Sequence, residues 1–382
     1  MSFLATAVPA IPARKRFVRT ATTIVWLVSL AALLFIAWHV IDAGFIRRDI
    51  EALRAGEAWQ TGGWLSQLVL SLVGLVPNLD WQQSLLSLTA AVVAGLAFGI
   101  LYDRLRANGW SIVGSALMLL LLASHANVLY TITAASRGLP LYLALAVIIP
   151  AIRKMEQVGD VQSTIGLGLL MPLLLLAGPL STPLIIPLAL GAALADPDGR
   201  SDARAFVAML LVAIIPALIV AVGVIGFVAQ SGIGVENVLL PYIGTYGALK
   251  LGDVRESLGV LFTFAPVAIV PILYCAWPNL PEKRHMGSAL AVVAMPVYLA
   301  IARMVFSSSM QPFVPAVALL AAYVSWLCVV RLPTLLRVVA IVMLAVAVVV
   351  SWTQTAFWDD AAWKVALFSR LDSGNLGLRP GV

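Results

Sequence analysis

Charged residues are scarce in this sequence of 382 residues. Asp, Glu, Lys and Arg make up 11% of it and hydrophobic residues 62%, whereas a soluble domain carries about a quarter of charged residues. The mean hydropathy is +1.00. Apolar stretches of about 20 residues recur almost from end to end, which leaves no room for a water-soluble core. The composition therefore predicts an all-α polytopic membrane protein with a single membrane domain over residues 1–382.

The sequence has only two cysteines and no nucleotide-binding motif. Cys275 and Cys328 are the only cysteines; they lack the spacing of a zinc site or redox pair, so we expect two free, buried thiols. Neither GxxxxGK[ST] nor GxGxxG occurs, which excludes ATP-driven transport by this chain alone. The 24 Lys and Arg lie in short clusters between apolar stretches. This distribution indicates membrane topology and no nucleic-acid partner.

The apolar stretches predict about eleven transmembrane helices. The first, residues 20–41, follows a basic N-terminal segment and precedes no cleavage site, so we interpret it as a retained signal anchor. An outer loop with interfacial helices is expected over residues 42–83, ten further spans over residues 84–351, and an outer tail over residues 352–382. The further spans are expected near residues 84–102, 110–124, 138–152, 163–178, 180–195, 205–229, 258–277, 287–305, 311–330 and 335–351.

The orientation depends on residues 65–77. These thirteen residues would extend only about 20 Å as a helix, less than a hydrocarbon core of about 30 Å. If they do not span the membrane, 14 of the 24 basic residues lie inside; if they do, only 11 do. Lys and Arg concentrate on the cytoplasmic side. We therefore expect a bacterial inner membrane protein with its N-terminus in the cytoplasm and its C-terminus outside.

The outer segments hold most of the polar residues available for chemistry. The longest are residues 42–84, 230–257 and 353–382, and the spans carry no Asp, Glu or Lys near their middles. This removes the usual signature of proton-coupled transport. The first outer segment begins DAGFIRRDIEALRAGEAW, with Ile46, Ile50 and Leu53 at helical spacing among charged residues. The pattern predicts an amphipathic helix on the membrane surface, which could equally be a plain interfacial anchor.

Asp42 stands at the outer end of the first span, with Asp49 two helical turns later. A carboxylate held there could act as general base toward an acceptor hydroxyl. This layout, and the opening DAGFIRRDIEALRAGE, resembles the GT-C superfamily of polyprenyl-phosphate-sugar-dependent glycosyltransferases, whose first outer loop opens on a similar D…A..L..G pattern. The resemblance implies a catalytic Asp42, a polyprenyl-phosphate-linked sugar as donor, and an envelope glycan, lipid or protein as acceptor.

The sequence departs from that family at its second acidic position. Many members carry a further carboxylate beside the first or in the next outer loop, but here Ala43 follows Asp42 and the next loop, HANVLYTITAASRG, has none. A non-catalytic subunit of an envelope complex, with a membrane-protein partner, is therefore an alternative. Residues 166–195 contain four prolines and predict two short helices joined at Gly178 and Pro179. Broken helices also occur in transporters, so a transporter or flippase of a lipid-linked substrate is the other alternative.

A phosphorylated lipid donor needs cations at the outer interface. Arg303 is the first candidate because it lies just inside the outer end of an apolar span, although it could also extend toward lipid headgroups. The other candidates are Arg137, Lys250 and Arg255, and the loop residues Tyr242, Tyr246 and Asp253 are candidates to contact the sugar. His125 could bind a divalent metal together with Asp42, or serve as an ordinary interface residue.

Overall fold

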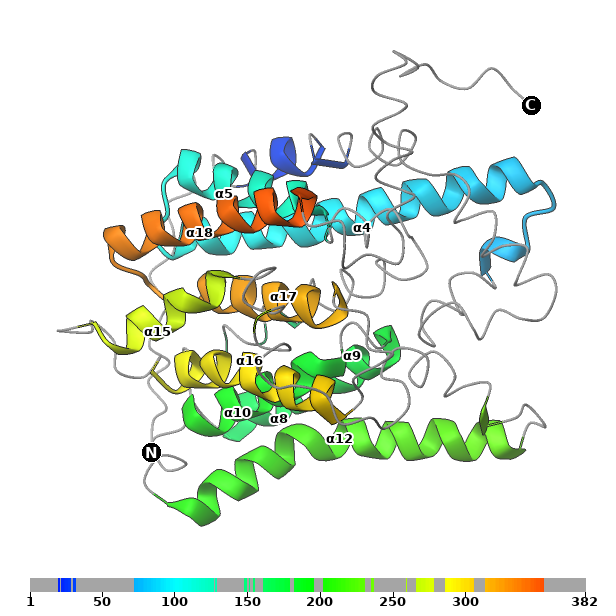
Figure 1. Cartoon of the computed structure of the whole chain (residues 1–382). Coiled ribbons are helices and arrows are strands. Elements are labelled where there is room, and N and C mark those ends of the chain that lie inside the picture. The colour runs from blue at the N-terminus through cyan, green and yellow to red at the C-terminus, as the bar shows by residue number, and fades with distance from the viewer. Residues whose placement is uncertain are drawn as a thin grey trace, which may run out of the picture.

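The computed structural model describes residues 20, 22–28, 30–31, 72–126, 128, 148–149, 151, 154, 161–178, 182–195, 202–230, 235–236, 259, 266–277, 286–305 and 313–353. All regular secondary structure in these ranges is helical, which confirms the predicted all-α fold. The elements are α4 (Leu79–Ala107), α5 (Ile112–Ser124), α8 (Val161–Gly168), α9 (Met171–Ala177), η2 (Thr182–Leu184), α10 (Ile185–Ala195), α12 (Ala203–Gln230), η3 (Pro266–Ala268), α15 (Ile269–Cys275), α16 (Met286–Val305), α17 (Phe313–Val329) and α18 (Thr334–Thr353) (Figure 1).

The surface of the helix bundle is apolar. Helices α12 and α18 are long and apolar enough to cross a membrane, yet only 17% and 28% of their most apolar windows are buried. A core helix of a soluble protein would be mostly buried, and a signal sequence would lie near the N-terminus, so neither explains them. Large side chains such as Val222 and Phe227 are more than two-thirds exposed. Exposure of so much apolar surface to water is unfavourable, and it is relieved when the helices face lipid.

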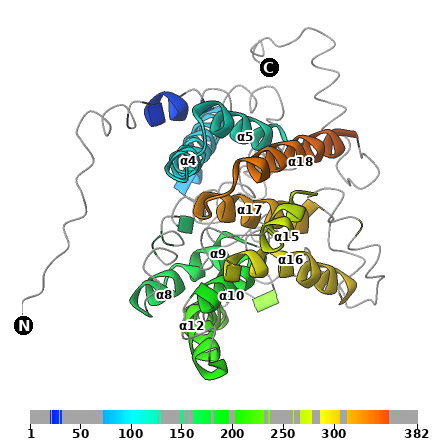
Figure 2. The same ribbon diagram turned by 90° about the vertical axis from the view of Figure 1, so that its left-hand side faces the viewer.

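The helices form two groups on either side of α17. A view along their axes shows α4, α5 and α18 on one side, and α8, α9, α10, α12 and α16 on the other (Figure 2). Within the second group α10 packs against both α16 and α12, and α17 contacts α4 as well as α16. The largest fully buried side chains are those of Tyr102, Tyr274, Tyr323, Phe98 and Leu86.

Helix α4 begins earlier and is longer than its predicted span. It starts at Leu79, not at residue 84, and ends at Ala107. Its 29 residues extend for about 43 Å, well beyond a hydrocarbon core of about 30 Å. The buried Gln82 side chain donates hydrogen bonds to the carbonyl oxygens of Val76 and Gly74, which attaches the preceding turn to the helix. Residues 65–71 of the doubtful outer segment lie outside the described part.

The predicted break near Gly178 is confirmed. Helix α9 ends at Ala177, and Gly178 has a φ of 117°, a conformation that a residue with a side chain rarely adopts. Helix α8 ends earlier, at Gly168, and the proline at the start of α9 fits the first turn of a helix, where its missing N–H costs nothing.

The two cysteines are both free, as predicted, but they differ in burial. Cys328 is buried, whereas Cys275, the last residue of α15, is only partly buried. The expectation of two buried thiols is therefore correct for Cys328 alone.

Candidate functional site

Most of the predicted site residues lie outside the described part of the chain. These are the two carboxylates, three of the four cations and the loop residues: Asp42, Asp49, Arg137, Lys250, Arg255, Tyr242, Tyr246 and Asp253. The backbone of Arg303 lies in the last turn of α16, but the position of its side chain is not among the features that the structure describes. The roles given to these residues therefore remain predictions.

The first span is fixed against α4 by two glycines. A Cβ atom on Gly95 would stand 3.3 Å from Cβ of Ala31, and one on Gly99 would stand 2.7 Å from Cγ of Leu27. Two small residues four apart let two membrane helices approach closely. Trp26 stacks on Tyr102 nearby, with ring centroids 5.5 Å apart.

The glycine contacts bear on the predicted site because Ala31 lies eleven residues before Asp42. The outer segment that begins with Asp42 follows a span that is packed against the bundle. Sequence reasoning missed this contact, although the spacing of Gly95 and Gly99 was the signal that could have indicated it.

His125 lies where α5 is joined to the end of α18. It caps α5, and its backbone N–H donates to the Leu122 oxygen at 3.3 Å. On either side of it, the backbone N–H of Ala126 donates to Oγ of Ser351 at 3.0 Å, and Nε1 of Trp352 donates to the Ser124 oxygen at 2.8 Å.

The surroundings of His125 do not form a metal centre within the described residues. Its side chain is fully buried, and in the parts of the chain that the structure describes no group of three or more His, Cys, Asp or Glu could hold a metal ion. Its predicted co-ligand, Asp42, is outside those parts. The described contacts show His125 as part of the packed junction between α5 and α18, and the metal site remains a prediction.

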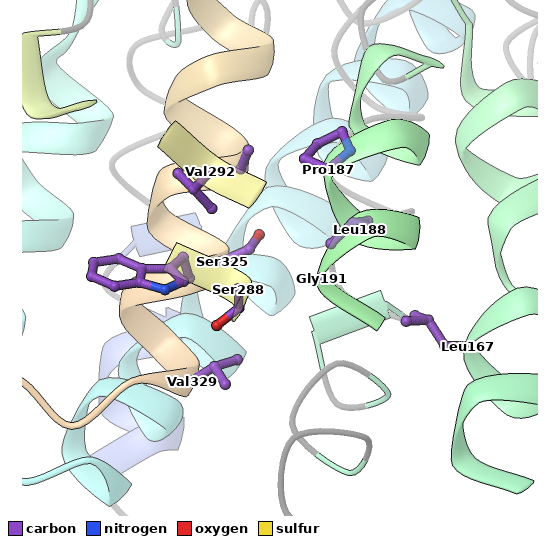
Figure 3. A pocket seen from close by; sticks show the side chains of 10 residues that line it. Leu167, Pro187, Leu188, Gly191, Ser288, Val292, Ser325 and Val329 are labelled. Atoms are coloured by element: carbon purple, nitrogen blue, oxygen red, sulfur yellow. The ribbon is translucent and has the colours of Figure 1, made fainter. Parts of the chain in front are cut away.

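A small cavity lies among α8, α10, α16 and α17 (Figure 3). Its volume is about 30 Å³, enough for about one water molecule. Ser288 and Ser325 project from neighbouring helices at its wall (Figure 3), and Ser325 donates to the Ala321 oxygen at 2.7 Å. The lining consists of Leu167, Pro187, Leu188, Gly191, Ser288, Val292, Ala322, Ser325, Trp326 and Val329.

The chemistry of this cavity is limited to weak polar contacts. None of its lining residues is ionisable, so it has no group for general acid or base catalysis at neutral pH. The buried Nε1 of Trp326, one of the lining residues, has no hydrogen-bond acceptor among the described residues. The cavity does not include any predicted site residue, and it is too small for a sugar.

Comparisons with known proteins give one structural likeness. No family model matches the sequence, and no curated protein matches it. One solved structure, the crystal structure of ArnT from Cupriavidus metallidurans bound to undecaprenyl phosphate, is similar at 14% identity with a TM-score of 0.45. The match covers 96% of this chain and 79% of that one.

Proposed function

We propose that this chain is a GT-C-like glycosyltransferase of the bacterial inner membrane, which transfers a sugar from a polyprenyl-phosphate carrier to an envelope glycan, lipid or protein on the outer face. The observation that carries the proposal is Asp42, the first residue of the opening DAGFIRRDIEALRAGE directly after the first span. The described helices support the membrane setting, since α12 and α18 expose most of their apolar windows. The contacts of Gly95 and Gly99 with Ala31 and Leu27 show that the span before Asp42 packs against α4.

The proposed reaction uses Asp42 as a general base. The carboxylate takes the proton of the acceptor hydroxyl while the hydroxyl oxygen forms a bond to the anomeric carbon of the donor sugar. The bond between that carbon and the phosphate oxygen breaks, and polyprenyl phosphate leaves. Negative charge develops on the leaving phosphate, and a guanidinium at the outer interface stabilises it. Arg303 is proposed for this role because it lies in the last turn of α16.

Activity of purified protein in lipid nanodiscs tests the proposal directly. The protein is incubated with a panel of polyprenyl-phosphate sugars, and release of polyprenyl phosphate is measured for the native chain and for Asp42→Asn. Asn keeps the size and the helix-capping ability of Asp but cannot accept the proton, so turnover should fall by about 100-fold or more. Asp202→Asn is the matched control, because Asp202 accepts the Arg204 N–H at 2.9 Å at the start of α12 and Asn can do the same.

Two other functions make different predictions in the same assay. A non-catalytic subunit is favoured by the missing carboxylate in the loop after His125, and it would release no polyprenyl phosphate from any donor. A transporter or flippase is favoured by the break between α8 and α10, and it would move a lipid-linked substrate across the bilayer without cleaving it. Full turnover by a stable Asp42→Asn protein would falsify the catalytic assignment.

A further inference from the structure

Four arginines lie at the end of the bundle where α4 leads into α5 and α17 leads into α18, and three of them, Arg106, Arg331 and Arg337, meet at the turn that contains Gly109 and Trp110. Arg104 and Arg106 lie in the last turn of α4. Arg331 lies just beyond α17, and Arg337 is the fourth residue of α18. This is the left-hand end of the molecule in Figure 1. The two turns are 228 residues apart in sequence at their point of contact, so the group exists only in the folded chain.

Arg337 is held in one position by the turn between α4 and α5. Its Nη1 donates to the carbonyl oxygen of Gly109, and its Nε donates to the Leu332 oxygen at 2.8 Å. Its guanidinium carbon lies 5.9 Å from the centre of the Trp110 ring, within the range of a cation–π contact. The chain fixes this cation before any ligand arrives.

Gly109 lets two guanidinium groups approach the same point. It has a φ of 84°, and a Cβ atom placed on it would stand 3.3 Å from Nη2 of Arg337 and 3.9 Å from Nε of Arg331. Arg106 comes close to the same turn, since its Nη1 donates to the Trp110 oxygen at 2.5 Å. Asn108 donates to the Cys328 oxygen and so joins the two turns.

The two turns that hold these arginines carry more positive than negative residues. Asp103 is the only carboxylate in residues 101–113 and 328–340, which contain all four arginines. The acceptors of the hydrogen bonds just described are main-chain oxygens, which carry no net charge. A guanidinium has five N–H donors, so most donors of the cluster are not used in these bonds. Buried donors at Nε of Arg104 and Nε1 of Trp110 have no acceptor among the described residues.

The cluster borders apolar surface. Ile112 and Val113 in the first turn of α5, and Leu335 and Val338 in the first turns of α18, are all more than half exposed. A ligand that suits both features has an anionic head and an apolar tail. Free phosphate would use the arginines but not the exposed side chains beside them.

We propose that the cluster of Arg106, Arg331 and Arg337 binds the phosphodiester headgroup of an anionic phospholipid in the leaflet at that end of the bundle. The phosphate oxygens accept from guanidinium N–H groups that take no part in the hydrogen bonds described above, and the acyl chains lie on the apolar first turns of α5 and α18. Basic pockets between membrane helices are known to bind such headgroups. Because Lys and Arg concentrate on the cytoplasmic side of membrane proteins, these residues are predicted to lie on that side. The site is distinct from the proposed catalytic segment and does not depend on its function.

Lipid-dependent thermal stability of the full chain in neutral detergent tests this site. Phosphatidylglycerol is titrated in, with phosphatidylcholine of the same acyl chains and inorganic phosphate as separate arms. A ligand that binds only the folded state raises Tm, so phosphatidylglycerol should raise Tm while the other two should not. Arg331→Gln should weaken the apparent affinity for phosphatidylglycerol about five-fold. Arg331 is exposed and makes none of the fixing contacts above, so this variant should fold normally.

Arg204→Gln is the matched control. Arg204 is an exposed arginine at the start of α12, predicted on the same side of the membrane but away from the cluster, and its removal should leave the affinity unchanged. An equal loss in Arg204→Gln and Arg331→Gln would overturn the proposal in favour of diffuse surface charge. An equal rise of Tm with phosphatidylcholine would overturn it in favour of apolar contact alone, and a rise with inorganic phosphate would identify a free anion as the ligand instead.

Discussion

The carbonyl oxygen of Val212 in α12 lies 2.5 Å from the point where a Cβ atom on Gly168 in α8 would stand, and the Ala213 Cα lies 3.2 Å from the same point. The obstacle is backbone, which cannot move aside as a flexible side chain can. This contact brings α8 against α12 near the site of Pro216, the proline within α12. Only glycine fits at position 168.

Gly168→Ala should therefore destabilise the fold by about 1 to 3 kcal/mol, the usual effect of overpacking. Gly166→Ala is the matched control on the same helix, because no atom of the described residues lies within 4 Å of its added Cβ. Alanine is the better helix former, so that control should be neutral or slightly stabilising. The measurement is the free energy of unfolding in mixed micelles. Equal stability of the two variants would mean that α8 and α12 can separate freely.

Gly99→Ala should weaken the packing of the first span, and Leu27→Ala should restore it. The added methyl group would meet Cγ of Leu27 at 2.7 Å, so the single variant should lose about 1 kcal/mol or more. The double variant removes the clash but also some apolar contact, and its coupling energy should be favourable. Gly223→Ala is the control, because its added Cβ meets no atom within 4 Å in the part of the chain that the structure describes. Additive effects of Gly99→Ala and Leu27→Ala would show that the two residues do not touch.

Ser351→Ala should loosen the junction between α5 and α18. Oγ of Ser351 accepts from the buried Ala126 N–H at 3.0 Å, and leaving that donor without a partner costs about 1 to 3 kcal/mol. Ser124→Ala is the control, since that exposed hydroxyl only donates back to the Leu120 oxygen within its own helix. Hydrogen exchange at the Ala126 amide should rise in Ser351→Ala and not in Ser124→Ala. An equal exchange rate at the Ala126 amide in both variants would show that Ser351 does not stabilise the junction.

A cysteine placed at Asn78 should react with an impermeant thiol reagent added from outside. Asn78 precedes α4 and is exposed, and the charge balance of the sequence places it on the outer side. A cysteine at Asn279 should react only after the membrane is made permeable. A Cys275→Ser background removes the partly buried native thiol from the readout. The opposite labelling pattern would invert the orientation of every span after the first.

Arg303→Ala should reduce release of polyprenyl phosphate more than Arg303→Lys does. A lysine keeps the charge but loses the two parallel hydrogen bonds of a guanidinium to a phosphate. The comparison is made on kcat and KM in the nanodisc assay, with Tm recorded for each variant. Native activity in both variants would leave Arg303 as a membrane anchor and transfer the donor-phosphate role to Arg137 or Lys250.

The candidate site could be predicted only as a set of residues. Asp42 was identified from its place after an apolar span and from a family-like opening, and both features are local in the sequence. Whether Asp42, Arg303 and Lys250 meet at one point depends on how distant outer segments fold over each other. No local pattern specifies that meeting, because residues far apart in sequence are brought together by packing.

The sequence by itself determined where most of the described helices lie. Hydrocarbon excludes unpaired backbone groups and charges, so each crossing leaves a long apolar run that can be read directly. The end of α9 before Gly178 could also be predicted from the local sequence, since glycine and proline change the conformation of their own backbone. The start of α4 was not determined in this way. The first residues of α4 include polar ones such as Gln82, so this part of the helix lies outside the apolar run from which the span was predicted.

Only the tertiary structure decided which helices touch and where. The pairs Gly168 with Val212, Gly99 with Leu27, and Arg337 with Gly109 are each separated by long stretches of sequence. In a bilayer the hydrophobic effect does not distinguish one apolar helix face from another, because lipid tails are as apolar as the side chains. The choice of partners falls to close backbone approach and single hydrogen bonds, which depend on atomic distances in the folded chain.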